Sequence, residues 1–142
     1  MQMAEVWAKR SKAVRKQVGA ILVKDRQIIS DGYNGMPAGD PDDVCEFIDF
    51  DDPDNGPHQP TLKTKPEVLH AESNAITKLS KNGGQGADGA TLYLTLSPCT
   101  ECAKLIKQTG IKRVVFRETY RDPGGIRFLQ QRGVEVEQLN KE

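Results

Sequence analysis

Two short stretches of the chain hold side chains that could bind a metal ion and transfer protons. Residues 70–72 read His-Ala-Glu, and residues 97–102 read Ser-Pro-Cys-Thr-Glu-Cys. One imidazole and two thiolates suit zinc, and three protein ligands leave one tetrahedral position open, as in catalytic zinc sites. The sequence therefore predicts zinc ligands at His70, Cys99 and Cys102. The carboxylate of Glu72 is not needed as a ligand and is placed to transfer protons beside the metal.

The two cysteines are predicted to lie at the start of a helix. Cys99 and Cys102 are three residues apart, so they share one helix face. Ser97 is a favourable N-cap and Pro98 suits the first helical position, which predicts a helix over residues 99–109. Cys99 then lies in the first turn, where free N–H groups and the helix dipole favour a thiolate.

Length and composition indicate a globular protein. The 142 residues are predicted to form a single domain, 1–142, with 37% hydrophobic and 28% charged residues. No apolar run approaches the roughly 20 residues that span a bilayer. The N-terminus lacks the apolar core of a signal peptide, which predicts a cytoplasmic location without a membrane partner. Three cysteines, two of them in one motif, do not form a disulfide framework.

Charge is balanced overall but unevenly distributed. The 20 basic and 20 acidic residues give a net charge of zero, which argues against long nucleic acid as a partner. Basic residues gather near the N-terminus, at Lys9, Arg10, Lys12, Arg15, Lys16, Lys24 and Arg26. A local basic cluster suits a small phosphorylated ligand, and it equally suits a solvated amphipathic helix.

Hydrophobic patterning predicts an α/β fold with a mixed five-stranded sheet and helices on both faces. Strands are expected at 18–23, 27–30, 91–96, 113–117 and 134–136, and helices at 3–12, 70–79, 99–109 and 122–129. Val6 and Trp7 are expected to form the buried face of the first helix. The first two strands form an antiparallel hairpin, and the alternating second half implies parallel pairing with right-handed crossovers.

Two segments between these elements are less regular. Residues 32–39 contain three glycines and a proline, and Asn34 there is either a left-handed turn residue or a binding residue. Residues 40–66 are predicted to be an irregular acidic insertion. They contain Cys45 and His58, which are too few for a second metal site and are expected to be a buried thiol and an exposed imidazole.

Ligands of such sheets bind beyond the carboxyl ends of the strands. The junction of strand 91–96 with the cysteine motif lies at one such end. Tyr120 and Arg121 follow the next strand and should open onto the same edge. Tyr120 could stack on a flat base and Arg121 could reach a phosphate, unless both are ordinary surface-loop residues.

The motif His-x-Glu followed by Pro-Cys-x-x-Cys is the signature of zinc-dependent deaminases. The chain as a whole resembles the deoxycytidylate (dCMP) deaminase family within the cytidine deaminase-like superfamily, because residues 32–35 read Gly-Tyr-Asn-Gly. Its short length and Ser-Pro-Cys form are similar to phage-encoded members. The matching segments cover most of the chain outside 40–66, and they are 18–23, 32–35, 70–76, 89–93, 97–104 and 110–115.

This resemblance implies a three-layer α/β/α fold and a hydrolase acting on the C–N bond of a cyclic amidine. One catalytic Zn²⁺ per chain would activate water to attack C4 of the cytosine of dCMP. Glu72 would carry the water's proton to N3 and later protonate the leaving amino group. The product dUMP would supply dTTP synthesis. Family members are commonly homohexamers that dCTP with Mg²⁺ activates and dTTP inhibits.

The resemblance also implies roles for individual residues. Asn34 matches the residue that contacts the sugar, and Tyr120 matches the aromatic residue over the base. The backbone at Ala71 and Ser97 would hold the pyrimidine edge. The effector site would use the loop around Gly35 and Gly39.

Three other functions remain open from the residues alone. A tRNA adenosine deaminase shares the metal motif, although a more basic chain is expected for binding a stem-loop. A free cytidine deaminase usually has more cysteine ligands and needs no phosphate-binding base. A non-catalytic zinc-binding oligomerisation module would not need Glu72. Whether Arg121, Arg15 or another base would hold the 5′-phosphate stays open.

Overall fold

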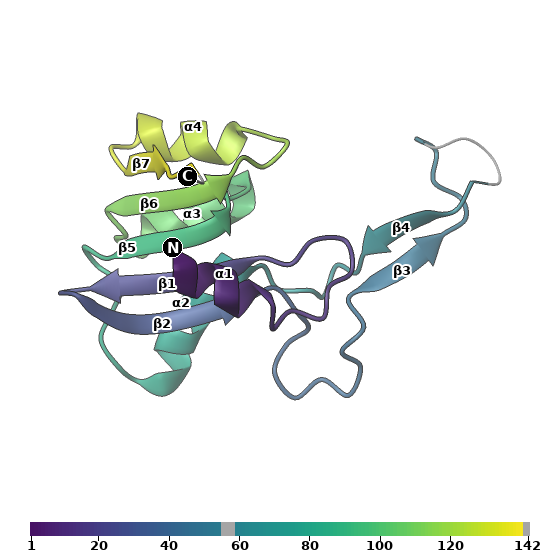
Figure 1. The fold of residues 1–142 in the computed structure, drawn as a ribbon, viewed down its shortest axis with the longest axis horizontal. Helices are drawn as coiled ribbons and strands as arrows, with labels where there is room; N and C mark the ends of the chain where they lie inside the picture. The colour runs from purple at the N-terminus through teal and green to yellow at the C-terminus, as the bar shows by residue number, and fades with distance from the viewer. Residues whose placement is uncertain (55–58, 141–142) are drawn as a thin grey trace.

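The centre of the structure is a five-stranded sheet with the strand order β2-β1-β5-β6-β7 (Figure 1). The computed structural model describes residues 1–54 and 59–140. The strands of this sheet are β1 (Gly19–Lys24), β2 (Gln27–Tyr33), β5 (Thr91–Leu96), β6 (Arg113–Glu118) and β7 (Glu135–Gln138). The helices are α1 (Gln2–Ala8), α2 (Ala71–Asn82), α3 (Thr100–Gln108) and α4 (Gly124–Gln131).

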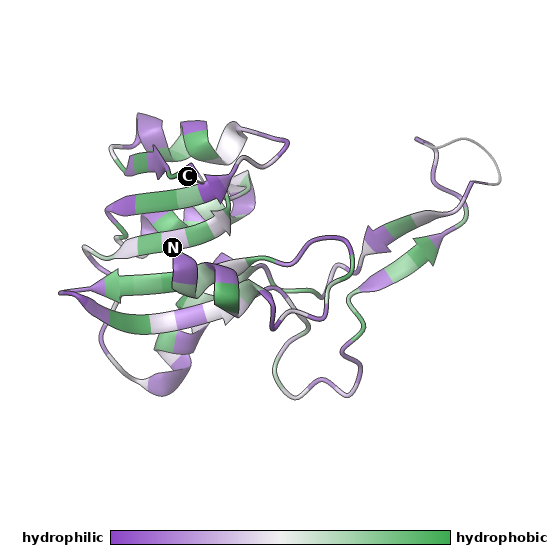
Figure 2. Ribbon diagram, viewed as in Figure 1, coloured by the Kyte–Doolittle hydropathy of each residue, from purple (hydrophilic) through white to green (hydrophobic). Residues whose placement is uncertain are grey.

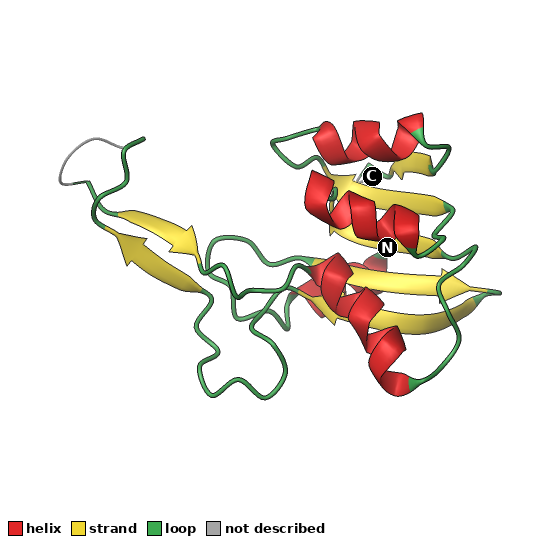
Figure 3. Cartoon of the chain, turned by 180° about the vertical axis from the view of Figure 1, so that it is seen from behind, coloured by secondary structure: helices red, strands yellow, loops and turns green. Residues whose placement is uncertain are grey.

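The sheet is mixed, as the sequence predicted. Strand β1 pairs antiparallel with both β2 and β5, whereas β5, β6 and β7 are parallel. Helices α2, α3 and α4 cover one face and α1 covers the other, which gives three layers (Figure 3). Since β5 and β6 run in the same direction, their carboxyl ends meet at one edge of the sheet.

The core lies between the sheet and the three-helix layer. Hydrophobic residues are concentrated on the central strands β1, β5 and β6 (Figure 2). Alternate residues of a strand face the same side, so Leu92 and Leu94 of β5 point into the core together. Ile106 of α3 and Leu129 of α4 complete this core and are fully buried.

Helix α1 packs differently from the sequence prediction. Val6 was expected in its buried face, but 55% of this residue is exposed, and the buried residues are Ala4 and Ala8. The reason is a backbone contact with β1, because a Cβ on Gly19 would lie 2.0 Å from the Ala4 carbonyl oxygen. Only small residues fit where a helix approaches a strand so closely, and the helix also ends at Ala8 instead of residue 12.

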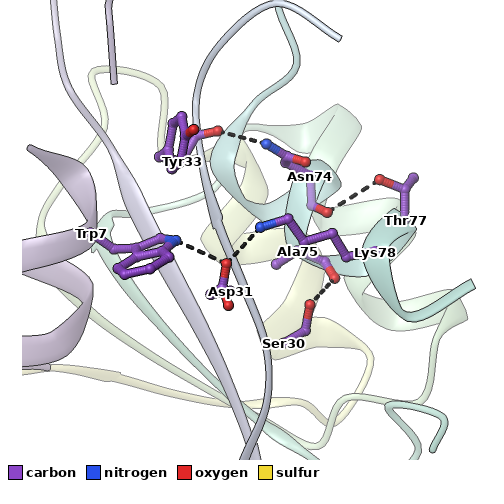
Figure 4. A network of polar contacts seen from close by, with 8 residues as sticks. All are labelled: Trp7, Ser30, Asp31, Tyr33, Asn74, Ala75, Thr77 and Lys78. Atoms are coloured by element: carbon purple, nitrogen blue, oxygen red, sulfur yellow. Dashed lines mark hydrogen bonds and ion pairs between the residues drawn. The ribbon is translucent and has the colours of Figure 1, made fainter. Parts of the chain in front are cut away.

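Polar contacts fix β2 between α1 and α2 (Figure 4). Asp31 of β2 accepts a hydrogen bond of 2.9 Å from Trp7 Nε1 and pairs at 2.6 Å with Lys78 Nζ. Asn74 of α2 donates to the Tyr33 carbonyl oxygen at 3.0 Å. These bonds orient α2 relative to the sheet, and with it the stretch that begins at His70.

Residues 40–66 correct a second prediction. They were expected to be irregular, but they contain the antiparallel hairpin of β3 (Glu46–Asp49) and β4 (Thr61–Thr64), which projects from the main sheet (Figure 1). Ion pairs of Lys63 with Asp49 and Asp52 offset the acidic charge of the segment. Its regularity comes from such cross-strand contacts, which a single strand's pattern does not reveal.

The described ranges contain no helix with both the length and the apolar character needed to span a membrane.

The contact between β2 and α2 generates a stability prediction. A Cβ on Gly32 would lie 2.4 Å from the Ala71 carbonyl oxygen and 2.7 Å from the Ala75 nitrogen. Gly32→Ala should therefore lower the free energy of unfolding by about 1–3 kcal/mol, the usual cost of overpacking. Urea denaturation is the measurement. Gly84→Ala is the control, because its added Cβ would meet nothing within 4 Å. Equal unfolding midpoints for the two variants would contradict the tight contact.

Candidate active site

The three predicted zinc ligands meet at the N-termini of α2 and α3. His70 is the N-cap of α2 and Cys99 is the N-cap of α3, both with extended backbone conformations. Cys102 follows within the first turn of α3. The Ser97 N-cap prediction is wrong, because the Ser97 side chain is engaged elsewhere: its Oγ accepts a 2.7 Å hydrogen bond from the Tyr120 N–H. The N-cap is consequently Cys99, two residues after Ser97, and helix α3 begins at Thr100, one residue later than expected.

The spacing of the donor atoms fits a zinc ion. His70 Nδ1 lies 3.3 Å from Cys102 Sγ and 3.6 Å from Cys99 Sγ, and the three ligand atoms all lie within 4.8 Å of one another. Tetrahedral zinc, with Zn–N near 2.0 Å and Zn–S near 2.3 Å, places N and S roughly 3.5 Å apart. The structure therefore forms a zinc-binding His/Cys/Cys site. In the described part of the chain, no other cluster of metal-ligating side chains forms.

Electrostatic coupling within this cluster favours the thiolate form of Cys99 but the protonated forms of Cys102 and His70. The pKa of Cys99 is lowered to about 4, first because its thiolate accepts a hydrogen bond from Cys102 and then because His70 lies beside it. The same hydrogen bond, together with burial, raises the pKa of Cys102. The hydrogen bond to Cys99 raises the pKa of His70. A metal ion would displace the remaining protons, as metal binding to thiols and imidazoles does.

Glu72 lies in the first turn of α2 and is 4% exposed. Burial raises its pKa, and the nearby His70 offsets part of this effect. A raised pKa makes a buried carboxylate hold a proton more readily than a free one does, and a proton-transfer group must be able both to accept and to return a proton.

A pocket of about 530 Å³ opens beside these residues. The predicted site residues that line it are Asn34, His70, Ala71, Glu72, Ser97, Cys99, Tyr120 and Arg121. Tyr120 and Arg121 thus lie at the sheet edge that the sequence predicted for them. The Arg121 guanidinium carbon lies 5.7 Å from the centre of the Tyr120 ring. The structure brings the metal cluster and these polar groups together in one cavity.

Asn34 lies at the pocket wall, where two hydrogen bonds to the backbone hold its side chain. Its Oδ1 accepts a 2.8 Å hydrogen bond from the Val18 N–H, and its Nδ2 donates at 2.8 Å to the Lys16 carbonyl oxygen. The left-handed alternative is wrong, because among described non-glycine residues only Asp25 and Arg26 have positive φ angles. Asn34 therefore shapes the loop before β1, and a contact with a sugar remains a prediction.

Four further residues border the pocket, namely Arg15, Lys16, Thr64 and Glu118. The sequence analysis named Arg15 as one candidate for holding a phosphate, but it gave no individual role to Lys16, Thr64 or Glu118. Both bases belong to the N-terminal basic cluster, whose charge was the signal available in the sequence. Thr64 lies on β4, in the segment expected to be irregular, so no local pattern pointed to it. Lys16 Nζ and Glu118 Oε2 form a half-exposed ion pair of 2.5 Å.

The predicted effector residues lie outside the pocket lining. Gly35 forms a bridge with Leu69, through hydrogen bonds of 3.1 and 2.8 Å between their backbones. Gly39 is exposed with a φ of 83°. Cys45 is fully buried, which confirms the expected buried thiol, and His58 lies outside the described residues.

Comparison with known proteins agrees with this site. Residues 1–118 match the family model described as the cytidine and deoxycytidylate deaminase zinc-binding region. The chain belongs to this deaminase family.

Relatives of the family cover nearly the whole chain. Deoxycytidylate deaminase of enterobacteria phage T4 is 34% identical, covering 96% of this chain and 86% of the phage protein. The human deoxycytidylate deaminase is 44% identical over 82% of this chain and 61% of its own length. A crystal structure of dCMP deaminase from the cyanophage S-TIM5, in complex with dCMP and dUMP, superposes with a TM-score of 0.84. That protein is 41% identical, over 97% of this chain and 92% of its own.

The ligand set generates a metal-content prediction. The wild-type protein should retain about one zinc ion per chain, and Cys102→Ala should retain far less, because it removes one of three ligands. Metal analysis after dialysis is the measurement. Cys45→Ala is the matched control, since Cys45 is a buried thiol outside the cluster. Equal zinc loss in both cysteine variants would contradict the assignment.

Proposed function

We propose that this chain catalyses the zinc-dependent hydrolytic deamination of dCMP to dUMP and ammonia. One observation carries the proposal: a single pocket combines residues of the metal cluster and the buried Glu72 with exposed bases, Arg15, Lys16 and Arg121. The buried part suits an amidine-like carbon, and the rim suits a phosphate. A related cyanophage deaminase, whose fold is shared, has been crystallised with dCMP and dUMP.

Each chemical step can be assigned to residues of this pocket. Zinc held by His70, Cys99 and Cys102 would supply Lewis-acid activation of water. Glu72 would accept a proton from the attacking water and deliver it to N3 of the pyrimidine. Glu72 would next take the remaining proton from the hydroxyl added at C4 and give it to the amino group. The C4–N4 bond would then break, so that dCMP and water give dUMP and ammonia.

Binding of the nucleotide would divide between the wall and the rim of the pocket. Tyr120 would stack on the base, and backbone groups at Ala71 and Ser97 would hold its edge. The Ser97 N–H already donates to the Glu118 carbonyl oxygen at 2.8 Å, so the Ser97 carbonyl is the group left for the base. Asn34 would face the sugar.

The phosphate would bind at Arg15 and Arg121. Arg15 donates to the hydroxyl of Thr64 at 3.2 Å, which is a neutral partner, and within residues 1–54 and 59–140 its guanidinium forms no ion pair. Lys16 is less suited, because Glu118 already pairs with it. Guanidinium groups also bind phosphate in two-pronged geometry, which an ammonium cannot.

Replacement of the proton-transfer group tests the mechanism. Glu72→Gln should lower kcat for dCMP by about 10²–10⁴-fold, the usual contribution of general acid–base catalysis, while zinc content stays at the wild-type level. Ammonia release from zinc-loaded protein is the measurement. If the wild-type protein with zinc bound released no ammonia from dCMP, the proposed function would be wrong. Unchanged turnover in the variant would remove Glu72 from the mechanism.

The proposal includes allosteric regulation by nucleotides and assembly into an oligomer. The family resemblance supports a homohexamer that dCTP with Mg²⁺ activates and dTTP inhibits, through the loop at Gly35 and Gly39. The bridge from Gly35 to Leu69 offers a route from the effector loop to the metal site, because Leu69 directly precedes the zinc ligand His70.

Turnover should rise with dCTP and Mg²⁺, and light scattering should give the mass of six chains. Turnover indifferent to dCTP would leave the chemistry and remove the effector site.

A further inference from the structure

Glu46 of β3 is a buried carboxylate that the deamination chemistry does not use. It is 7% exposed and lies on the projecting hairpin, not in the pocket lining. Its Oε1 accepts hydrogen bonds from the Val14 N–H at 2.7 Å and from the Arg15 N–H at 3.3 Å. A buried carboxylate that bonds to two backbone N–H groups holds the position of the loop that carries them.

The same hairpin also holds the Arg15 side chain. Thr64 of β4 is the register partner of Glu46 in β3 and accepts the 3.2 Å hydrogen bond from the Arg15 guanidinium. The cross-strand pair of Glu46 and Thr64 thus contacts both the backbone and the guanidinium group of Arg15. The side chain of this base is exposed and long, so without these contacts it would sample many rotamers.

The other end of the loop is fixed by the main sheet. Asn34, which follows β2, bonds to the Lys16 carbonyl oxygen and the Val18 N–H. The loop before β1 is therefore held by Asn34 on one side and by Glu46 on the other. Arg15 lies on the side that depends on the hairpin.

We propose that Glu46 is a positioning residue for phosphate recognition, and that the β3–β4 hairpin is thereby part of the nucleotide site. This inference rests on the proposed function, because it requires a phosphorylated substrate. The negative charge of Glu46 does not oppose phosphate binding directly, since the carboxylate is bonded to the loop backbone and lies outside the pocket lining. Glu46 acts through Arg15 and not on the reacting atoms.

Steady-state kinetics with dCMP test the role. Glu46→Ala should raise KM by about tenfold, the factor expected for losing one charge-assisted hydrogen-bonded anchor, while kcat stays within about twofold. Glu46→Gln keeps an oxygen acceptor and should recover most of the wild-type KM. Asp49→Ala, which removes a carboxylate from the same strand that pairs with Lys63 instead, is the control and should leave KM unchanged.

A double-mutant cycle separates positioning from general destabilisation. In an Arg15→Ala background, Glu46→Ala should have little further effect on KM, because the base that it positions is gone. Additive effects, or a parallel fall in kcat, would overturn the proposal. If Glu46→Ala does not fold, Thr64→Val tests the same cross-strand pair of the hairpin. This variant should raise KM by about threefold with normal zinc content. An unchanged KM would overturn the proposal.

Failure of this inference is distinguishable from failure of the proposed function. Turnover of dCMP by the wild-type protein with an unchanged KM in the Glu46→Ala variant overturns the positioning role alone. Absence of wild-type turnover with zinc bound overturns both.

Discussion

The structure depends on bringing three donor atoms from two helices to one point. His70 and Cys99 are the N-caps of α2 and α3, so the starts of both helices must be fixed to within a fraction of an ångström for zinc to bind. Glycine contacts provide this precision. Gly32 allows α2 to approach β2, and a Cβ on Gly125 of α4 would lie 2.1 Å from the Pro98 carbonyl oxygen, just before Cys99. Close backbone packing thus sets the metal geometry.

The pocket joins two parts of the chain with different physical roles. The sheet edge and the helix starts provide the metal cluster and a buried carboxylate whose pKa burial raises. The loop before β1 and the segment after β6 provide exposed bases, and the projecting hairpin contacts one of them, Arg15. A nucleotide has the same division, with a flat heterocycle at one end and a phosphate at the other. The two ends of the pocket are therefore complementary to the two ends of dCMP.

Much of the fold and the chemistry could be predicted from local patterns. The strand over residues 91–96 has the predicted bounds, and the order of helices and strands in the second half is confirmed. The ligands His70, Cys99 and Cys102 could be identified because zinc imposes both residue type and spacing. These features depend on neighbours in sequence, so the sequence shows them directly.

The features that were missed depend on contacts between distant residues. The hairpin of β3 and β4 pairs residues that are 12 to 18 positions apart, and its anchor Glu46 bonds to a loop 31 and 32 residues earlier. The buried face of α1 is decided by Gly19, and the start of α3 is decided by the hydrogen bond from Tyr120 to Ser97. None of these has a signature within its own segment.

The central claim is that the zinc ion keeps one position open for chemistry. X-ray absorption at the zinc edge measures this directly, because it counts sulfur and lighter ligands around the ion. The structure predicts two sulfur ligands, one imidazole nitrogen and one light ligand that changes when dUMP is added. A third sulfur, or a set of four protein ligands that dUMP leaves unchanged, would contradict the claim and indicate a closed structural site.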